Sequence, residues 1–160
     1  MSVSIRRLTS SDVPLLRALL TTFGKVFNQP DIYIANQPGE VYLRQLLGDA
    51  TFIALVALKG EETVGGLTAY ELRKYEQERS EVYIYDLCVA SGHRREGIAT
   101  SLIEALKRIA AERGAWVVIV QADTGIEDQP AIALYSKLGK REQVLHFDIA
   151  VETGPGTEKR

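Results

Sequence analysis

The run EVYIYDLCV at residues 81–89, followed by ASGHRREGIAT at residues 90–100, decides the fold. The first part is rich in aromatic and β-branched residues and predicts a strand. The second part combines arginine and glycine and then begins a helix. A strand that leads into a helix N-terminus through such a turn is typical of anion binding, because free backbone N–H groups and the positive helix end converge there. With Asp86 on the strand as a candidate base, the stretch predicts a phosphate-bearing cofactor and an enzyme.

The composition is that of an ordinary globular protein. The chain has 160 residues, 46% of them hydrophobic and 25% charged, which predicts one domain with its own core. A net charge of −2 argues against a nucleic-acid partner. The single cysteine precludes an internal disulfide, and no apolar run reaches the roughly 20 residues that span a bilayer. We therefore expect a cytoplasmic protein with neither a nucleic-acid nor a membrane partner.

Hydrophobic periodicity and turn residues define the expected elements. We predict strands at residues 3–8, 51–59, 63–72, 81–89, 115–122 and 144–151, and helices at about 12–24, 40–47, 97–113 and 131–138. This order predicts a mixed α/β sheet with a parallel crossover between the fourth and fifth strands. The apolar run at 115–122 predicts burial on both faces. One domain is expected over residues 1–151, followed by a disordered tail at 152–160.

Two further segments carry local predictions. Gly65 and Gly66 lie inside a predicted strand, which indicates a bulge or a close backbone approach. Residues 28–39 are rich in turn formers and carry Tyr33, so we expect a loop there, either a plain connection or a flap on the substrate side.

The turn at residues 94–100 has the residue types that a phosphate requires. Gly97 has no side chain to block a close ligand, and Ala99 keeps the first helical turn small. Arg94 and Arg95 can add charge-assisted hydrogen bonds. The alternative is a surface turn with two solvated arginines.

Asp86 is the candidate general base. A carboxylate can accept a proton from an amine and can also bind its ammonium form. In a regular strand Asp86 would share a face with Ile84 and Cys88, so that an apolar face would hold it. The alternative is a structural aspartate that caps a loop or pairs with Arg79. Glu81, at the start of the same strand, is the rival base.

Nucleophilic cysteine and metal chemistry have little support. Cys88 is most simply a small buried hydrophobic residue, with no histidine at a spacing that would make it a nucleophile. The two histidines and one cysteine have no metal-ligand spacing, so no metal is expected.

Two ordered motifs resemble the GNAT superfamily of N-acetyltransferases. Arg-x-x-Gly-x-Ala at 94–99 follows a strand that ends in Leu87-Cys88-Val89, and DQPAIALYSKLG at 128–139 resembles the late helix of the family. Asp128 stands where the family often has Asn, and Lys140 where it often has Phe. The resemblance implies a single-domain, mostly antiparallel mixed sheet with a V-shaped parallel opening, flanked by about four helices.

The resemblance also implies acetyl-CoA as the cosubstrate and Tyr135 as a general acid near the CoA sulfur. A plain core tyrosine is the alternative for Tyr135. The implied cofactor-binding residues are Leu87, Cys88, Val89, Arg94, Arg95, Gly97, Ile98, Ala99, Thr100, Asp128 and Ala131.

A closer likeness links the chain to the aminoglycoside 3-N-acetyltransferases of the gentamicin-resistance type. It rests on TFIAL at 51–55, YIYDL at 83–87, VQAD at 120–123 and HFDI at 146–149, among other short runs. It implies acetyl transfer to the 3-amino group of the deoxystreptamine ring in a ternary complex, antibiotic resistance and a homodimer. The acceptor would be a cationic small molecule bound by Glu81, Tyr85, Asp86, Asp123 and Glu127.

Two other functions remain open on the sequence. The chain could acetylate a different amine, such as a polyamine or a protein N-terminus. It could also be a regulatory module that binds CoA without catalysis, although the presence of both Asp86 and Tyr135 argues against that reading.

Overall fold

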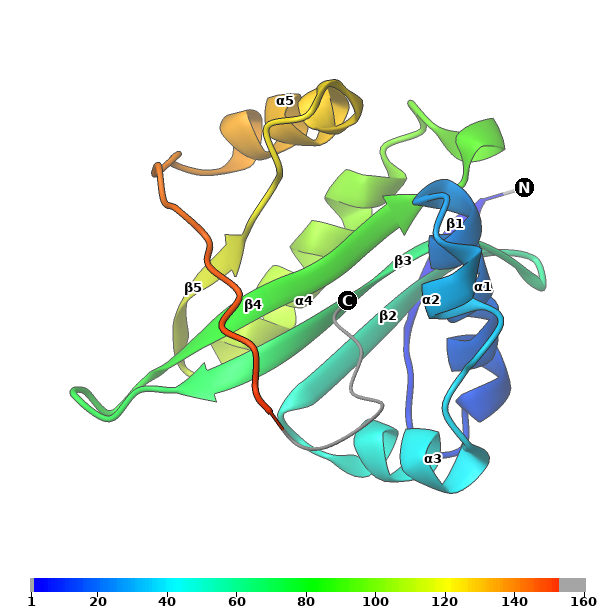
Figure 1. Cartoon of the computed structure of the whole chain (residues 1–160), viewed down its shortest axis with the longest axis horizontal. Coiled ribbons are helices and arrows are strands. Elements are labelled where there is room, and N and C mark those ends of the chain that lie inside the picture. The colour runs from blue at the N-terminus through cyan, green and yellow to red at the C-terminus, as the bar shows by residue number, and fades with distance from the viewer. Residues whose placement is uncertain (1, 153–160) are drawn as a thin grey trace. The chain divides into compact units, whose positions relative to one another are not determined.

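A computed structural model describes residues 2–152, which divide between Gln121 and Ala122 into two compact units. The first unit contains a five-stranded sheet in the order β1-β2-β3-β4-β5 (Figure 1). Its strands are β1 (Val3–Arg7), β2 (Phe52–Lys59), β3 (Glu62–Arg73), β4 (Ser80–Val89) and β5 (Ala115–Val120). Its helices are α1 (Val13–Val26), α2 (Pro30–Tyr33), α3 (Glu40–Gly48) and α4 (Ile98–Glu112), with a 3₁₀ turn, η1 (Ser91–His93).

The sheet has the mixed pairing that the sequence predicts. Strands β1 to β4 pair antiparallel in chain order, and β4 pairs parallel with β5. The parallel pairing runs from Ser80 opposite Ala115 to Ile84 opposite Val120, whereas β4 itself continues to Val89. Because β5 ends at Val120, β4 continues from Tyr85 to Val89 without β5 beside it, and the mixed sheet confirms the GNAT-like fold class. This edge of β4 beyond the end of β5 is called the opening below.

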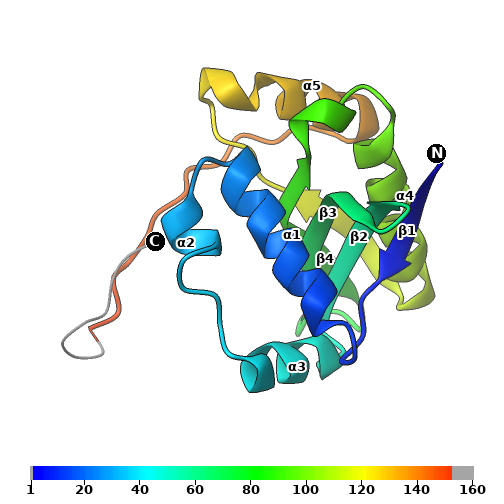
Figure 2. The same ribbon diagram turned by 90° about the vertical axis from the view of Figure 1, so that its right-hand side faces the viewer.

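Helices cover both faces of the sheet. Helix α4 packs on one face, and α1, α2 and α3 lie on the other (Figures 1 and 2). Successive β2 side chains alternate between these layers. Phe52, Ala54 and Val56 join the buried cluster formed with Leu19 and Phe23 of α1. The face that carries this cluster is called the α1 face below.

A β-bulge in β4 corrects the predicted parity of Asp86. Ile84 pairs with Ala69, and Asp86 pairs with the adjacent Thr68, so Tyr85 is an extra residue on β4. The extra residue reverses the alternation. Asp86 and Cys88 turn to the α1 face, because Cys88 belongs to the buried cluster there. Ile84 stays on the face that α4 covers, so Asp86 does not share a face with it.

Two other predictions for the first unit need correction. Residues 28–39 are not all loop, because they contain α2, where Pro30 occupies the first turn. Strand β5 is not buried on both faces. It lies at the end of the strand order, its side chains are half-buried, and Trp116 is 53% exposed.

The second unit contains a 3₁₀ turn, η2 (Ile126–Asp128), and helix α5 (Gln129–Leu138). The predicted strand at 144–151 is wrong, because none of residues 140–152 is in a strand or helix. The apolar side chains of residues 144–151 are exposed to solvent, and Phe147 is 76% exposed. A strand needs a partner for its backbone groups, and residues 122–152 contain no other strand to provide one. The predicted tail, except Glu152, lies outside the described residues.

Two glycines in β3 confirm the predicted close approach. A Cβ on Gly65 would lie 2.7 Å from the Cys88 carbonyl oxygen. A Cβ on Gly66 would lie 2.5 Å from Leu19 Cδ1 and 2.6 Å from the Leu55 carbonyl oxygen. Helix α1 can therefore pack this closely on the sheet only because Gly66 of β3 has no side chain. Among residues 2–152 no helix is long and apolar enough to cross a membrane.

We expect Gly66→Ala to lower the free energy of unfolding by about 1–3 kcal/mol, because the methyl group overpacks the α1 seat. Urea denaturation measures the change. Gly48→Ala, at the end of α3, is the matched control, because nothing lies within 4 Å of its added Cβ. A Gly66→Ala variant as stable as Gly48→Ala would contradict the packing.

Candidate active site

The turn between β4 and α4 presents backbone donors to solvent. Gly97 is the N-cap residue of α4 with φ of 77°, and Arg95 also has a positive φ, of 64°. The first hydrogen bond of the helix runs from Ser101 N–H to the Gly97 carbonyl at 3.0 Å. No side chain within residues 2–152 caps this end. The N–H groups of the first turn therefore lie free of side-chain caps at the positive end of the helix dipole, the arrangement that suits an anion.

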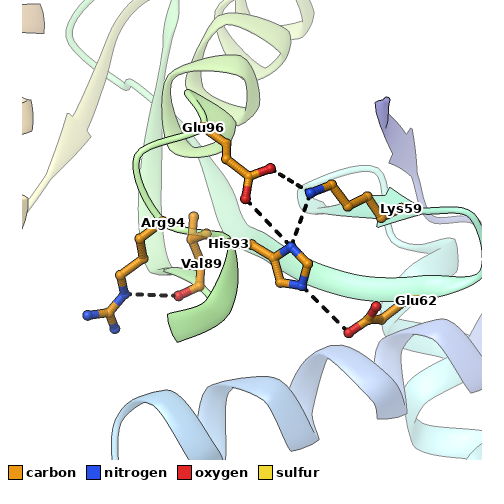
Figure 3. Close-up of polar contacts among 6 residues, drawn as sticks. All are labelled: Lys59, Glu62, Val89, His93, Arg94 and Glu96. Carbon is orange, nitrogen blue, oxygen red and sulfur yellow. Dashed lines mark hydrogen bonds and ion pairs between the residues drawn. The ribbon is translucent and has the colours of Figure 1, made fainter. Parts of the chain in front are cut away.

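A polar network holds this turn against the β2–β3 hairpin (Figure 3). Lys59 Nζ lies 2.5 Å from Glu96 Oε1 and 3.3 Å from His93 Nδ1. His93 Nε2 lies 3.7 Å from Glu62 Oε1 on the other side. The hydrogen bond from Lys59 holds the pKa of Glu96 below its usual value. His93 thus points toward the hairpin, and its contacts anchor the turn.

Arg94 and Arg95 are the exposed cations of the turn. Arg94 Nε lies 3.5 Å from the Val89 carbonyl oxygen, and its side chain extends away from His93 (Figure 3). The guanidinium is therefore available to an anion at the helix start.

Backbone N–H groups of β4 line the opening beside β5. The Ala90 N–H bonds the Val64 carbonyl of β3 at 2.8 Å. Because successive N–H groups of a strand point to opposite sides, those of Val89 and Leu87 point away from β3, where β4 has parted from β5. This alternation selects Val89 and Leu87, rather than Cys88, as possible donors to a carbonyl in the opening.

Asp86 lies half-buried just beyond the last β4–β5 pair. The Tyr33 hydroxyl donates a hydrogen bond to Asp86 Oδ2 at 3.1 Å. The structural alternative of an Asp86–Arg79 pair is not supported, because the Arg79 guanidinium stacks 4.2 Å above the Trp116 ring. The residue that sequence reasoning missed here is Tyr33. Its only signal was Pro30 followed by Asp31, a helix-start pattern inside an assumed loop.

Glu81 has a different environment from Asp86. Its carboxylate lies 3.6 Å from Lys74 Nζ. It pairs with Leu72 and Val117, inside the region where β4 is hydrogen-bonded on both sides. Their partners on β3, Leu72 and Thr68, are four positions apart, which places Glu81 roughly 13 Å from Asp86. Glu81 is therefore an ion-paired residue away from the opening, which favours Asp86 as the base.

Cys88 is a buried free thiol. Burial, with a smaller contribution from the negative charge of Asp86, raises the pKa of its thiol to about 12. A thiol with that pKa is not ionised at neutral pH, so Cys88 is not equipped to act as a nucleophile.

The remaining predicted residues belong to the second unit. Asp123 and Glu127 are exposed. Asp128 is the N-cap residue of α5, and Ala131 lies in its first turn. Burial, with a smaller contribution from Asp128, raises the pKa of Tyr135 to about 12, so its phenol stays protonated at neutral pH. That these residues belong to the same site as those of the first unit stays a prediction.

The chain matches the acetyltransferase (GNAT) family over residues 15–140. Two solved structures from uncultured soil metagenomic samples are similar to it, and both are described as aminoglycoside acetyltransferases. One is 60% identical, with a TM-score of 0.94, and the match covers 95% of this chain and 100% of that one. The other was solved with sisomicin and is 34% identical, with a TM-score of 0.85 and coverage of 94% and 97%.

The chain is also 27% identical to the N-acetyltransferase 8B of Rattus norvegicus over 127 residues, which is 72% of this chain and 56% of the relative. It thus spans about half the length of the curated relatives it matches. The family match covers most of the chain, so the protein belongs to the GNAT acetyltransferase family.

Acetyltransferases of this family use acetyl-CoA, and the first unit fits that group. Helix α4 offers uncapped N–H groups, and Arg94 and Arg95 add charge beside them. The space where a Gly97 Cβ would lie is open to 4 Å, so the backbone can approach a phosphate closely. Within residues 2–152 no cluster of His, Cys, Asp or Glu is placed to hold a metal ion.

We expect Gly97→Ala to weaken acetyl-CoA binding about tenfold, because a side chain at this positive φ costs about 1–2 kcal/mol and shifts the helix start. Isothermal titration calorimetry gives the dissociation constant. Gly92→Ala in the same turn is the control, because Gly92 has ordinary φ and open space around its Cβ. Equal affinities for the two variants would contradict an anion site built on Gly97.

Proposed function

We propose that this protein transfers an acetyl group from acetyl-CoA to the 3-amino group of the deoxystreptamine ring of gentamicin-type aminoglycosides, and so confers resistance. The observation that carries the proposal is the position of Asp86. Its carboxylate lies on the α1 face immediately beyond the point where β4 leaves β5. The same strand then continues into the anion-binding start of α4. A base and a cofactor turn are thus joined by a few residues of chain.

Aromatic side chains next to Asp86 support a sugar-like acceptor. The Tyr85 ring is 46% exposed and lies 5.9 Å from the Tyr70 ring and 6.0 Å from the Tyr83 ring, centroid to centroid. Aromatic faces can pack against the apolar faces of sugar and cyclitol rings, and their π-systems attract ammonium groups. Together with the Asp86 carboxylate, this tyrosine surface suits a polycation with rings better than a flexible polyamine.

The solved relatives supply the second support. The 60% identical structure is described as an aminoglycoside acetyltransferase, and the 34% identical one binds sisomicin. Since both match almost the whole chain, the same substrate class is the simplest expectation here. A cytoplasmic homodimer remains part of the proposal.

The proposed reaction is direct attack in a ternary complex. When bound, acetyl-CoA supplies an activated acetyl group as its thioester. The turn of residues 94–100 binds the pyrophosphate, and the Val89 N–H polarises the acetyl carbonyl. Asp86, directly or through a water, accepts the proton of the attacking amine. The Tyr135 hydroxyl gives a proton to the departing sulfur. Close positioning of amine and thioester supplies much of the acceleration.

A second candidate function is acetylation of another amine. The match to a rat N-acetyltransferase 8B favours this candidate, although it is weaker in identity and coverage. Such an enzyme would share the turn at 94–100 and differ in the residues that contact the acceptor.

A panel assay tests the function. Thiol release is followed with acetyl-CoA and gentamicin, sisomicin, spermidine or a peptide N-terminus. We expect turnover with the aminoglycosides, and NMR of the product should locate the acetyl group on the 3-amino nitrogen. Turnover only with polyamine or peptide would replace the proposal by the second candidate. No turnover with any amine would favour a binding module.

The role of Asp86 is tested by Asp86→Asn. We expect kcat on gentamicin to fall at least about 100-fold, because the amide cannot accept the amine proton. Acetyl-CoA affinity should stay within about twofold of wild type, since the turn at 94–100 is untouched. Asp31→Asn, at an exposed position of α2, is the matched control. Turnover like that of the control would remove Asp86 from the mechanism.

Tyr135→Phe tests the general acid. We expect kcat to fall, but by less than in Asp86→Asn, because water can also protonate a thiolate. A general acid works only below its pKa, which in Tyr135 is raised to about 12. Tyr135 ionisation should therefore cause no loss of rate in the wild type at mildly alkaline pH. A loss at least as large as that of Asp86→Asn would show that the roles are assigned wrongly.

A further inference from the structure

We propose that Tyr33 is a positioning residue that holds the Asp86 carboxylate in its ionised, aimed state. The inference rests on the proposed function, in which Asp86 is the base. Tyr33 comes from α2 and lies 53 positions from Asp86 in the chain, yet its hydroxyl donates to Asp86 Oδ2 at 3.1 Å. Neither the family motifs nor the turn at 94–100 involves this residue.

The hydrogen bond has two chemical consequences. A donor to a carboxylate oxygen stabilises the ionised form, which is the form that accepts a proton. It also fixes the position of Oδ2, and with it the direction in which the carboxylate faces. Tyr33 therefore sets both the charge and the orientation of the base.

Tyr33 is rigidly held, as a positioning group must be. It is only 5% exposed. Its ring packs against Phe23 of α1 at 5.8 Å and Phe27, the residue that follows α1, at 5.7 Å, centroid to centroid. The two phenylalanine rings stack on each other at 5.4 Å. Three aromatic rings in mutual contact leave the phenol little freedom to swing away.

The close packing of α2 on α1 also limits the movement of Tyr33. Gly24 of α1 faces α2, and a Cβ there would lie 2.5 Å from Ile34 Cγ1 and 3.2 Å from Tyr33 Cβ. The Gln37 side chain donates to the Tyr33 carbonyl at 3.0 Å and accepts from Arg17 at 3.3 Å. The approach of α2 to α1 thus depends on the absence of a side chain at Gly24.

Several titratable groups lie around Asp86. Cys88 and Tyr83 of β4 are close enough for the Asp86 charge to raise their pKa values, and the positive charge of Arg94 is close enough to Cys88 to act in the opposite direction. β3 places Thr68 opposite Asp86, and α1 contributes apolar Leu19 and Phe23 to this side of the sheet. Tyr33, from α2, donates to the carboxylate in these half-buried surroundings.

The test is Tyr33→Phe, which keeps the ring cluster and removes the hydroxyl. Carbon-13 NMR of the aspartate carboxyl groups follows the ionisation of Asp86, and the Asp86→Asn spectrum assigns its signal. We expect the titration midpoint to move to higher pH by about 1 unit in Tyr33→Phe, because the ionised form has lost a donor. The acid limb of kcat/KM should move the same way.

Two variants guard against a purely structural effect. Tyr42→Phe, at an exposed position of α3, is the matched control and should leave both curves unchanged. Gly24→Ala keeps the hydroxyl but displaces α2, and should shift both curves in the same direction by a smaller amount. If Tyr33→Phe fails to fold, Gly24→Ala carries the test.

A double-mutant cycle completes the assignment. If Tyr33 acts through Asp86, Tyr33→Phe should lower kcat in the wild-type background and have little further effect in Asp86→Asn. Additive losses, or a midpoint that does not move, would overturn the proposal. The NMR midpoint needs no substrate. Failure of the aminoglycoside assay alone would therefore count against the proposed function, whereas an unmoved midpoint would count against Tyr33.

Discussion

The extra residue at Tyr85 is the constraint on which the site depends. A regular β4 would leave Asp86 on the face that α4 covers, beside Ile84, where a carboxylate would be desolvated without a partner. The bulge turns Asp86 to the α1 face instead, opposite Thr68 and within reach of Tyr33. Because of this one inserted residue, Asp86 is half-buried and hydrogen-bonded instead of buried beneath α4.

The bulge also divides β4 into two parts that differ in their strand partners. From Ser80 to Ile84 the strand is paired on both sides and belongs to the sheet. From Asp86 to Val89 it keeps β3 as its antiparallel partner after β5 has parted from it, which leaves backbone N–H groups directed into the opening. The turn at 94–100 follows directly and is anchored to the β2–β3 hairpin through Lys59, His93 and Glu96. Asp86 and the turn at 94–100, the proposed base and cofactor site, are therefore held in place by the same strand and hairpin.

The sequence predicted what depends on local pattern. The elements from residue 3 to 120 other than α2, the parallel crossover, the Gly66 close approach and the glycine turn before α4 all follow from periodicity or residue type. Three features depend on distant partners and did not follow. The bulge depends on register with β3, α2 is stabilised by packing on Gly24 and Phe23, and a strand at 144–151 would need a partner that residues 122–152 lack. Tyr33 was missed for this reason, because only the fold brings it to Asp86.

The most direct measurement of the central claim is the distance from the acceptor amine to Asp86 in a crystal structure with CoA and sisomicin. The account predicts that the 3-amino nitrogen lies within hydrogen-bonding distance of an Asp86 carboxylate oxygen, or one water away, while Oδ2 keeps its bond from Tyr33. The acceptor should lie on the α1 face, with CoA at the start of α4. An acceptor amine next to Glu81, or one beyond the reach of Asp86 even through a water, would contradict the account.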